Sequence, residues 1–204
     1  MKKRLLFFLA LFFCASFLML NAQTPEFYGM TSTGGGDNIG NIFKTDINGD
    51  NAQLVFDFPK ENSGRNPVYS ELTAASDGKL YGMTANGGTN SRGVLFAYDP
   101  GSNTYTKKLD FNGTNGANPN GSLMEASNGK LYGMTVNGGA NNRGVLFEYD
   151  TGNNAYTKKL GFNGNNGVNP LGSIMEASNG KLYGMTLFLR IIPLILQTHY
   201  HTKL

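Results

Sequence analysis

The chain has few of the residues on which catalytic sites and crosslinks usually depend. It contains one cysteine, two histidines and no tryptophan in 204 residues. Cys14 lies in an apolar run that we expect to be removed, so neither disulfides nor thiol chemistry belong to the expected mature chain. His199 and His201 are a weak metal signal, and they cannot complete a Ser/His/Asp set without further partners. The composition therefore argues against the common hydrolytic mechanisms.

The charge balance is also unremarkable once the N-terminus is set aside. Three of the 17 Lys and Arg residues fall within residues 1–22, whereas all 14 Asp and Glu residues lie beyond them. The expected mature chain then carries no net formal charge. A strong electrostatic attraction to nucleic acid or to an anionic membrane surface is not indicated.

Residues 1–22 have the pattern of a signal peptide. Basic residues at positions 2–4 precede the apolar run Leu5–Leu20, and Ala22 is a small residue directly before Gln23. The pattern predicts cleavage after Ala22 and a secreted or cell-surface location. A retained membrane anchor is the alternative, although a spanning helix needs about 20 apolar residues. We do not expect lipidation at Cys14, because a lipoprotein cysteine needs a small residue directly before it and Phe13 is large.

Glycine is abundant, and it recurs in a long internal repeat. Gly78–Asn128 aligns with Gly129–Asn179 over 51 positions without a gap, and 39 positions are identical. A third copy begins at Gly180, and a divergent copy precedes Gly78. A period of this length is typical of solenoids, propellers and arrays.

Each copy contains four short segments of β-type sequence. In one full copy they are Ser122–Ala126, Leu131–Thr135, Val145–Tyr149 and Tyr156–Phe162. Asn-Gly between the first two predicts a hairpin with positive φ at both turn positions. The long connector Phe162–Gly172 then leads to the next copy. The pattern predicts an all-β fold of tandem four-stranded antiparallel blades of the propeller type.

Lysines in the fourth segment place it at an exposed edge, since lysine protects a strand from pairing with other chains. We therefore expect that segment at the outer rim and the first segment near the axis. The divergent copy begins with the second segment. Residues 23–186 thus hold a partial first copy, two full copies and a partial last copy, whereas closed propellers need roughly four to eight blades. An incomplete, open arc is predicted. The lysines are Lys107, Lys108, Lys158 and Lys159.

The phrases LYGMT, NGG and RGVLF, preceded by ASNGK, resemble the GloVer tandem repeat of bacterial surface and secreted proteins. The resemblance covers about Glu26–Thr186. It implies export and a repeated β architecture, often with a separate sorting or anchoring domain. It implies no established activity, so no functional residue follows from it.

One candidate metal site lies in the divergent first copy. Asp46, Asn48 and Asp50 occupy positions 1, 3 and 5 of a calcium-loop pattern, and Asp57 falls at position 12. However, Asn51 replaces the glycine of the sharp turn. The same residues align with a hairpin between the third and fourth segments. We favour the hairpin and predict no specific calcium requirement.

Two further pairs of polar residues recur at equivalent positions. Arg92 and Arg143 precede the third segment, where a guanidinium could bind a carboxylate or phosphate through two hydrogen bonds. Local pairing in a solvated loop is the simpler interpretation. Glu125 and Glu176 lie on the first segment, where they could line a channel. A single carboxylate in each copy does not form an acid/base pair.

Tyrosine and methionine alternate along the second segment. A sugar-stacking surface is one interpretation of this pattern, and packing between blades is the one we favour. The residues are Tyr81, Met83, Tyr132 and Met134.

Residues 187–204 depart from the repeat. They read LFLRIIPLILQTHYHTKL and contain neither glycine nor asparagine. Arg190 and Pro193 interrupt the apolar run, which is too short for a membrane span. The abrupt change indicates a frameshift or a truncated reading frame. We expect a poorly packed tail and an arc that associates through its open blade faces.

The sequence assigns no catalytic, cofactor-binding or metal-binding residue. We expect an exported, non-enzymatic β-repeat protein that serves as a binding or surface-display module for an unknown extracellular ligand, either a glycan or a protein. No nucleic-acid partner and no membrane span in the mature chain are expected. The alternative is a fragment of a secreted propeller enzyme, such as a carbohydrate-active hydrolase.

Overall fold

The computed structural model describes residues 25–59, 62–187 and 192–194, and this part of the chain is built of strands and turns. It contains no helix long and apolar enough to cross a membrane. The expected signal peptide, residues 1–22, lies outside the described residues. So do His199 and His201.

The strands form four antiparallel sheets, numbered here in chain order. Sheet 1 comprises β1 (Glu26–Thr31), β2 (Asn41–Asp46) and β3 (Gln53–Asp57), and sheet 2 comprises β4 (Thr73–Ala74), β5 (Leu80–Thr84), β6 (Val94–Asp99) and β7 (Thr104–Asp110). Sheet 3 comprises β8 (Ala117–Pro119), β9 (Met124–Glu125), β10 (Leu131–Asn137), β11 (Val145–Asp150) and β12 (Ala155–Gly161), and sheet 4 comprises β13 (Met175–Glu176), β14 (Leu182–Gly184) and β15 (Ile192–Leu194).

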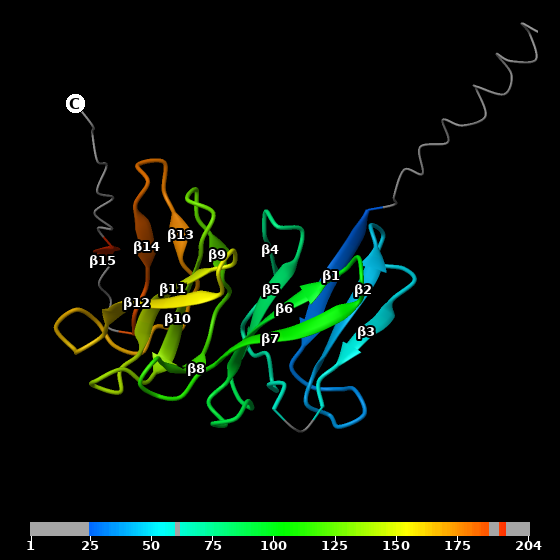
Figure 1. Ribbon diagram of the computed structural model, residues 1–204, viewed down its shortest axis with the longest axis horizontal. Helices are drawn as coiled ribbons and strands as arrows, with labels where there is room; N and C mark the ends of the chain where they lie inside the picture. Colours follow the sequence, from blue (N-terminus) through cyan, green and yellow to red (C-terminus); the bar gives the residue numbers. More distant parts are fainter. Residues whose placement is uncertain (1–24, 60–61, 188–191, 195–204) are drawn as a thin grey trace, which may run out of the picture.

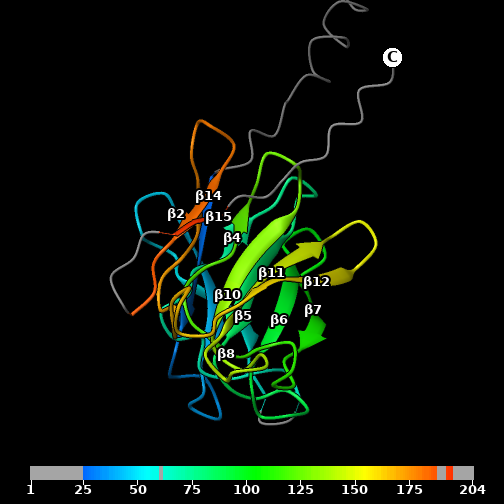
Figure 2. The same cartoon turned by 90° about the vertical axis from the view of Figure 1, so that its left-hand side faces the viewer.

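The predicted meander is confirmed. Sheet 2 has the order β4-β5-β6-β7, and sheet 1 lacks the first strand, as the divergent copy predicts. The lysine-bearing strands β7 and β12 form sheet edges. The sheets follow one another in an open row from β1–β3 to β13–β15 (Figure 1), and lie one behind another when viewed from the β13–β15 end (Figure 2).

The first segment of the repeat is shorter than the predicted Ser122–Ala126. Only Met124–Glu125 pairs with β10, since Ser122 N donates instead to Ser173 Oγ (2.9 Å) and Leu123 O accepts a hydrogen bond from Thr73 Oγ1 (2.7 Å), both in neighbouring sheets. Ala126 N donates to Lys130 O (2.9 Å) and closes the hairpin. The turn also differs from the prediction. Gly129 has positive φ (74°) whereas Asn128 does not, so the hairpin has a three-residue turn with glycine in the left-handed position.

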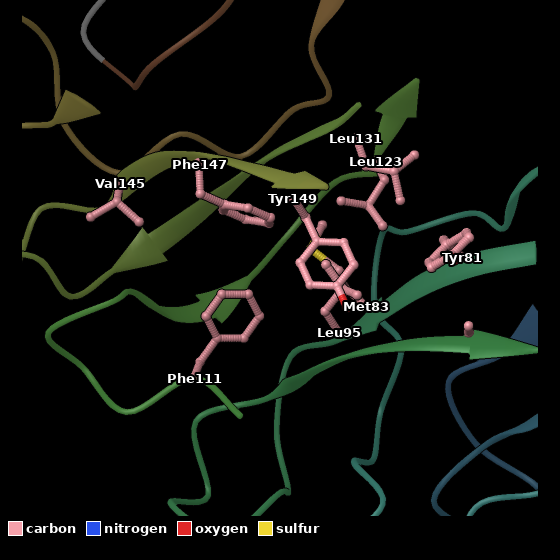
Figure 3. Close-up of a cluster of buried hydrophobic side chains, with 10 residues drawn as sticks. Tyr81, Met83, Leu95, Phe111, Leu123, Leu131, Val145, Phe147 and Tyr149 are labelled. Atoms are coloured by element: carbon pink, nitrogen blue, oxygen red, sulfur yellow. The ribbon is translucent and has the colours of Figure 1, made fainter. Parts of the chain in front are cut away.

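Alternation along the strands gives each sheet two apolar faces. We call the face turned toward the next sheet in the chain the forward face, and the opposite one the rear face. Tyr81 and Met83 on the forward face of sheet 2 join Phe147 and Tyr149 on the rear face of sheet 3 in one buried cluster (Figure 3). Equivalent clusters join sheets 1 and 2 and sheets 3 and 4. The core therefore lies between the sheets, as in stacked repeats.

The third strand of sheet 4 was not anticipated from the sequence. β15 pairs antiparallel with β14 through Leu182↔Leu194 and Gly184↔Ile192, in the position that β6 and β11 occupy in sheets 2 and 3. Apolar residues of the atypical segment therefore continue the sheet without the GVLF motif. β14 ends at Gly184, whereas its counterpart β5 in sheet 2 extends over all five residues of LYGMT.

Candidate functional site

The loops between the second and third strands have the same construction in three copies. In each loop a glycine N–H donates to the carbonyl of a glycine six residues earlier, which closes the loop on itself. Positive φ at these glycines explains why the loops are rich in that residue. The pairs are Gly40 with Gly34 (3.1 Å), Gly93 with Gly87 (3.0 Å) and Gly144 with Gly138 (3.0 Å).

The following connector holds each loop in place. Asn118 N donates to Arg92 O (2.8 Å), and Asn118 Nδ2 donates to Ala85 O (3.0 Å). Asn169 makes the equivalent bonds to Arg143 O (2.9 Å) and Val136 O (2.9 Å). Each loop is thus held to the connector at both of its ends, at the arginine carbonyl and at the carbonyl of Ala85 or Val136.

Arg92 and Arg143 therefore occupy equivalent, exposed positions on rigid loops. The guanidinium of Arg92 lies beside the connector glycine Gly113, and that of Arg143 beside Gly164. Neither arginine takes part in an ion pair with a carboxylate of the described residues, which include both loops and their connectors. The simpler interpretation of the sequence was that each arginine pairs with a nearby carboxylate in its loop. The described residues contain no such ion pair. Such a group can bind a carboxylate or phosphate through two parallel hydrogen bonds.

The calcium-loop pattern forms a hairpin turn between β2 and β3. Asp46 Oδ1 accepts hydrogen bonds from Asn48 N (3.0 Å) and Asp50 N (2.9 Å), and Oδ2 accepts one from Asn51 Nδ2 (2.8 Å). The Asn51 side chain lowers the pKa of Asp46, and the backbone hydrogen bonds add to this effect, which together outweigh the opposing effect of burial. Asn51 takes the left-handed turn conformation itself (φ 53°).

Asp57 lies far from that turn in the pairing register. It faces Asn41 at one end of β2, whereas Asp46 lies at the other end. Asp57 Oδ2 accepts a hydrogen bond from Gly36 N (2.6 Å). Within the described ranges no three His, Cys, Asp or Glu side chains gather as a metal cluster. The predicted lack of a calcium requirement stays a prediction.

A hollow of about 270 Å³ lies beside the same turn, between Glu26, Lys44, Asp46 and Gln53. Its charged groups are already paired, since Lys44 Nζ donates to Glu26 Oε1 (2.7 Å). The hydrogen bond from Lys44, together with one from Tyr28, lowers the pKa of Glu26. These contacts account for the polar lining without a ligand.

The alternating tyrosines and methionines pack between sheets. Tyr81, Met83, Tyr132 and Met134 are each 1–2% exposed. The interpretation as inter-blade packing is confirmed, and a sugar-stacking surface is excluded at these positions because no ring face is open.

Glu125 and Glu176 do not stand free in a channel. Glu125 accepts hydrogen bonds from Ser76 N (2.9 Å) and Ser76 Oγ (2.6 Å) of the preceding sheet. Glu176 accepts the same pair from Ser127 N (2.7 Å) and Ser127 Oγ (2.7 Å). Both carboxylates therefore fasten one first-strand hairpin to the next.

Sheet 3 contains a buried carboxylate that was not expected from the sequence. Glu148 is 9% exposed and accepts hydrogen bonds from Tyr132 Oη (2.7 Å) and Lys130 Nζ (3.2 Å), and it pairs with Lys159 Nζ (3.2 Å). Burial opposes ionisation, but these three partners outweigh it and lower the pKa of Glu148. Burial, together with the hydrogen bond to Glu148, raises the pKa of Tyr132 to about 12. The available signal was glutamate in place of Ala97 of the sister copy.

Comparison with known proteins supports the repeat and the fold. A family model described as a Gloeobacter/Verrucomicrobia repeat matches residues 16–188. No curated protein matches the chain. The extracellular domain of a putative one-component system from B. thetaiotaomicron is similar in structure, with 16% identity and a TM-score of 0.54 over 82% of this chain and 20% of that one.

A second similar structure is the extracellular domain of a putative hybrid two-component system from the same organism. It has 17% identity and a TM-score of 0.52, over 82% of this chain and 20% of that one. The chain thus spans about a fifth of the length of these structures. At such low identity, the likeness shows the fold alone.

Proposed function

The chain belongs to the Gloeobacter/Verrucomicrobia repeat family, and we propose that it is an exported, non-enzymatic binding module. Export is what its resemblance to this family implies. Its ligand is an acidic extracellular glycan, held by the loops that carry Arg92 and Arg143. Those two guanidiniums are the observation that carries the proposal. They are exposed, they stand on rigid loops, and they recur at the same position in adjacent copies.

The repeat favours binding over catalysis for a physical reason. Catalysis needs different groups in different roles around one reacting atom. Here adjacent copies present the same side chain in the same backbone frame, which suits a ligand that repeats its own charge. A polymer with a carboxylate on successive sugars has this property. The extracellular location of the two similar domains from B. thetaiotaomicron agrees with such a setting.

The test is a glycan array probed with the chain expressed from residue 23. Binding is expected to uronic-acid polymers and not to their carboxyl-reduced forms. The double variant Arg92→Ala/Arg143→Ala should lose at least tenfold in affinity, since each charged, two-bond contact is worth about 1.5–3 kcal/mol.

The matched control is Lys158→Ala/Lys181→Ala, which removes the same charge from exposed positions away from these loops. If both double variants lose affinity equally, general electrostatics and not the arginine loops would explain binding. A panel of glycosidase substrates should show no turnover, and turnover would favour the hydrolase alternative.

A further inference from the structure

We propose that two copies of this chain close head to tail into one ring of eight sheets. The forward face of sheet 4 in each copy would pack on the rear face of sheet 1 in the other. This inference concerns assembly and is independent of the proposed glycan site, which lies on the loops and not on the sheet faces.

The forward face of sheet 4 carries the residues that are buried at every internal junction. Tyr183 and Met185 stand where Tyr132 and Met134 stand in sheet 3. Met134 is 2% exposed, whereas Met185 is 68% exposed. Among the described residues, no sheet covers this face, although it carries the residues that are buried between sheets elsewhere in the row.

The rear face of sheet 1 keeps the pattern that receives such a face. At internal junctions, the second strand presents a large apolar residue, then glycine, then threonine, at alternate positions. A phenylalanine of the third strand lies over that glycine. Sheet 1 repeats this with Phe27, Gly29, Thr31 and Phe43, as sheet 2 does with Leu80, Gly82, Thr84 and Phe96 and sheet 3 with Leu131, Gly133, Thr135 and Phe147.

Contacts at an internal junction indicate how the two open faces would meet. The methyl carbon of Met134 lies 3.1 Å from where a Cβ on Gly184 would stand. Where the receiving sheet has a phenylalanine over its glycine, the methionine packs in the cluster of that ring, as Met83 does with Phe147, so Met185 of one copy would pack beside Phe43 of the other. Phe27 and Leu54, 54% and 58% exposed on this rear face, would be covered.

The number of sheets agrees with closure. Each copy contributes four sheets in an open row (Figure 1), and two copies give eight, the upper end of the usual range of four to eight blades. A head-to-tail contact forms a ring if its rotation closes and a filament if it does not. Each internal junction buries or half-buries the Tyr and Met of the preceding sheet's second strand, and a junction of the same kind between copies would continue the row around the ring.

The experiment is sedimentation velocity with light scattering on the chain expressed from residue 23. The expected mass is twice that of one chain and does not grow with concentration. Met185→Lys and Phe27→Lys, on the two opposed faces, should each halve the mass while leaving cooperative thermal unfolding, and Met185→Leu should retain the dimer.

Ile47→Lys is the matched control. Ile47 is 59% exposed in the turn between β2 and β3, away from both faces, so this variant should stay dimeric. A monomeric parent chain, with the open face covered by another segment of the same chain or by water, would overturn the proposal. So would a mass that grows with concentration, or a dimer that survives both Met185→Lys and Phe27→Lys.

Discussion

Single glycines in the second strand allow the sheets to hold an aromatic ring against their own backbone. A Cβ at Gly133 would lie 2.6 Å from Phe147 Cζ and 2.8 Å from Leu123 Cδ2. Gly29 and Gly82 have the same relation to Phe43 and Phe96. The requirement is steric, because the ring occupies the volume that a side chain would need.

We predict that Gly133→Ala lowers the free energy of unfolding by about 1–3 kcal/mol, the usual cost of overpacking a core. Chemical denaturation of both proteins measures it. Gly161→Ala is the control, since no atom lies within 4 Å of its added Cβ. An equal effect of the two substitutions would contradict the steric explanation.

Glu148 should make stability depend on pH. Its pKa is lower in the folded chain than its usual value, so its contribution is present above the unfolded pKa and is lost as pH falls through the folded value. We expect Glu148→Gln to cost about 1–3 kcal/mol at pH 7, where Tyr132, Lys130 and Lys159 lose a charged partner. The difference should shrink steadily below about pH 4.5.

Thermal unfolding between pH 3 and pH 7 measures this. Glu71→Gln, at an exposed carboxylate, is the control and should change little. A Glu148→Gln deficit that stays constant over this range would mean that the ionised state of Glu148 does not contribute.

At the scale of elements, the connectors decide how one sheet is fixed to the one before it. Asn118 and Asn169 reach back to the preceding loop through both backbone and side chain, each with positive φ (51° and 43°). Tyr156 Oη adds a bond to Asn115 O of the preceding connector (2.7 Å). Adjacent sheets are thus joined by polar contacts at their ends as well as by apolar contacts between their faces.

Asn118→Ala should lower the free energy of unfolding by about 2–3 kcal/mol. It loses the side-chain hydrogen bonds to Ala85 O and from Asn137 Nδ2, whereas the backbone bond to Arg92 O remains, and it forces alanine into a left-handed conformation. Asn118→Gly loses the same bonds but accepts positive φ, so it should cost less. Denaturant titration of both separates the two effects, and Asn90→Ala in an exposed loop is the control. Equal losses from alanine and glycine would assign the whole effect to the hydrogen bonds.

At the scale of the whole molecule, the row of sheets has a direction. Every forward face of sheets 1–3 is covered by a rear face, and the two faces without a partner sheet among the described residues lie at opposite ends of the row (Figure 1). Four of the most exposed large apolar residues belong to the sheet 4 end, namely Leu171, Met175, Met185 and Leu187.

Export is a prediction for the whole chain. Expression of the full chain in a secreting bacterial host should yield a mature protein that begins at Gln23, or at pyroglutamate formed from it, because Ala22 is the small residue before the cleavage point. Intact-mass measurement and N-terminal peptide mapping check this. A mature form that still contains Cys14 would show that the N-terminal segment is retained.

The sequence by itself determined the all-β class, the antiparallel order and the four-segment period. Turn glycines and two-residue alternation are local signals that each copy retains, and edge lysines occur in both full copies. It also predicted that Tyr81, Met83, Tyr132 and Met134 pack between sheets.

The tertiary structure decided what depends on neighbours distant in the chain. Glu125 accepts hydrogen bonds from Ser76 of the preceding sheet, and Glu148 pairs with Lys130, in the turn before β10, and with Lys159 of β12. Apolar residues outside the repeat motif added the third strand, β15, to sheet 4. The backbone N–H and C=O groups of an open strand edge can pair with any extended segment, whatever its side chains.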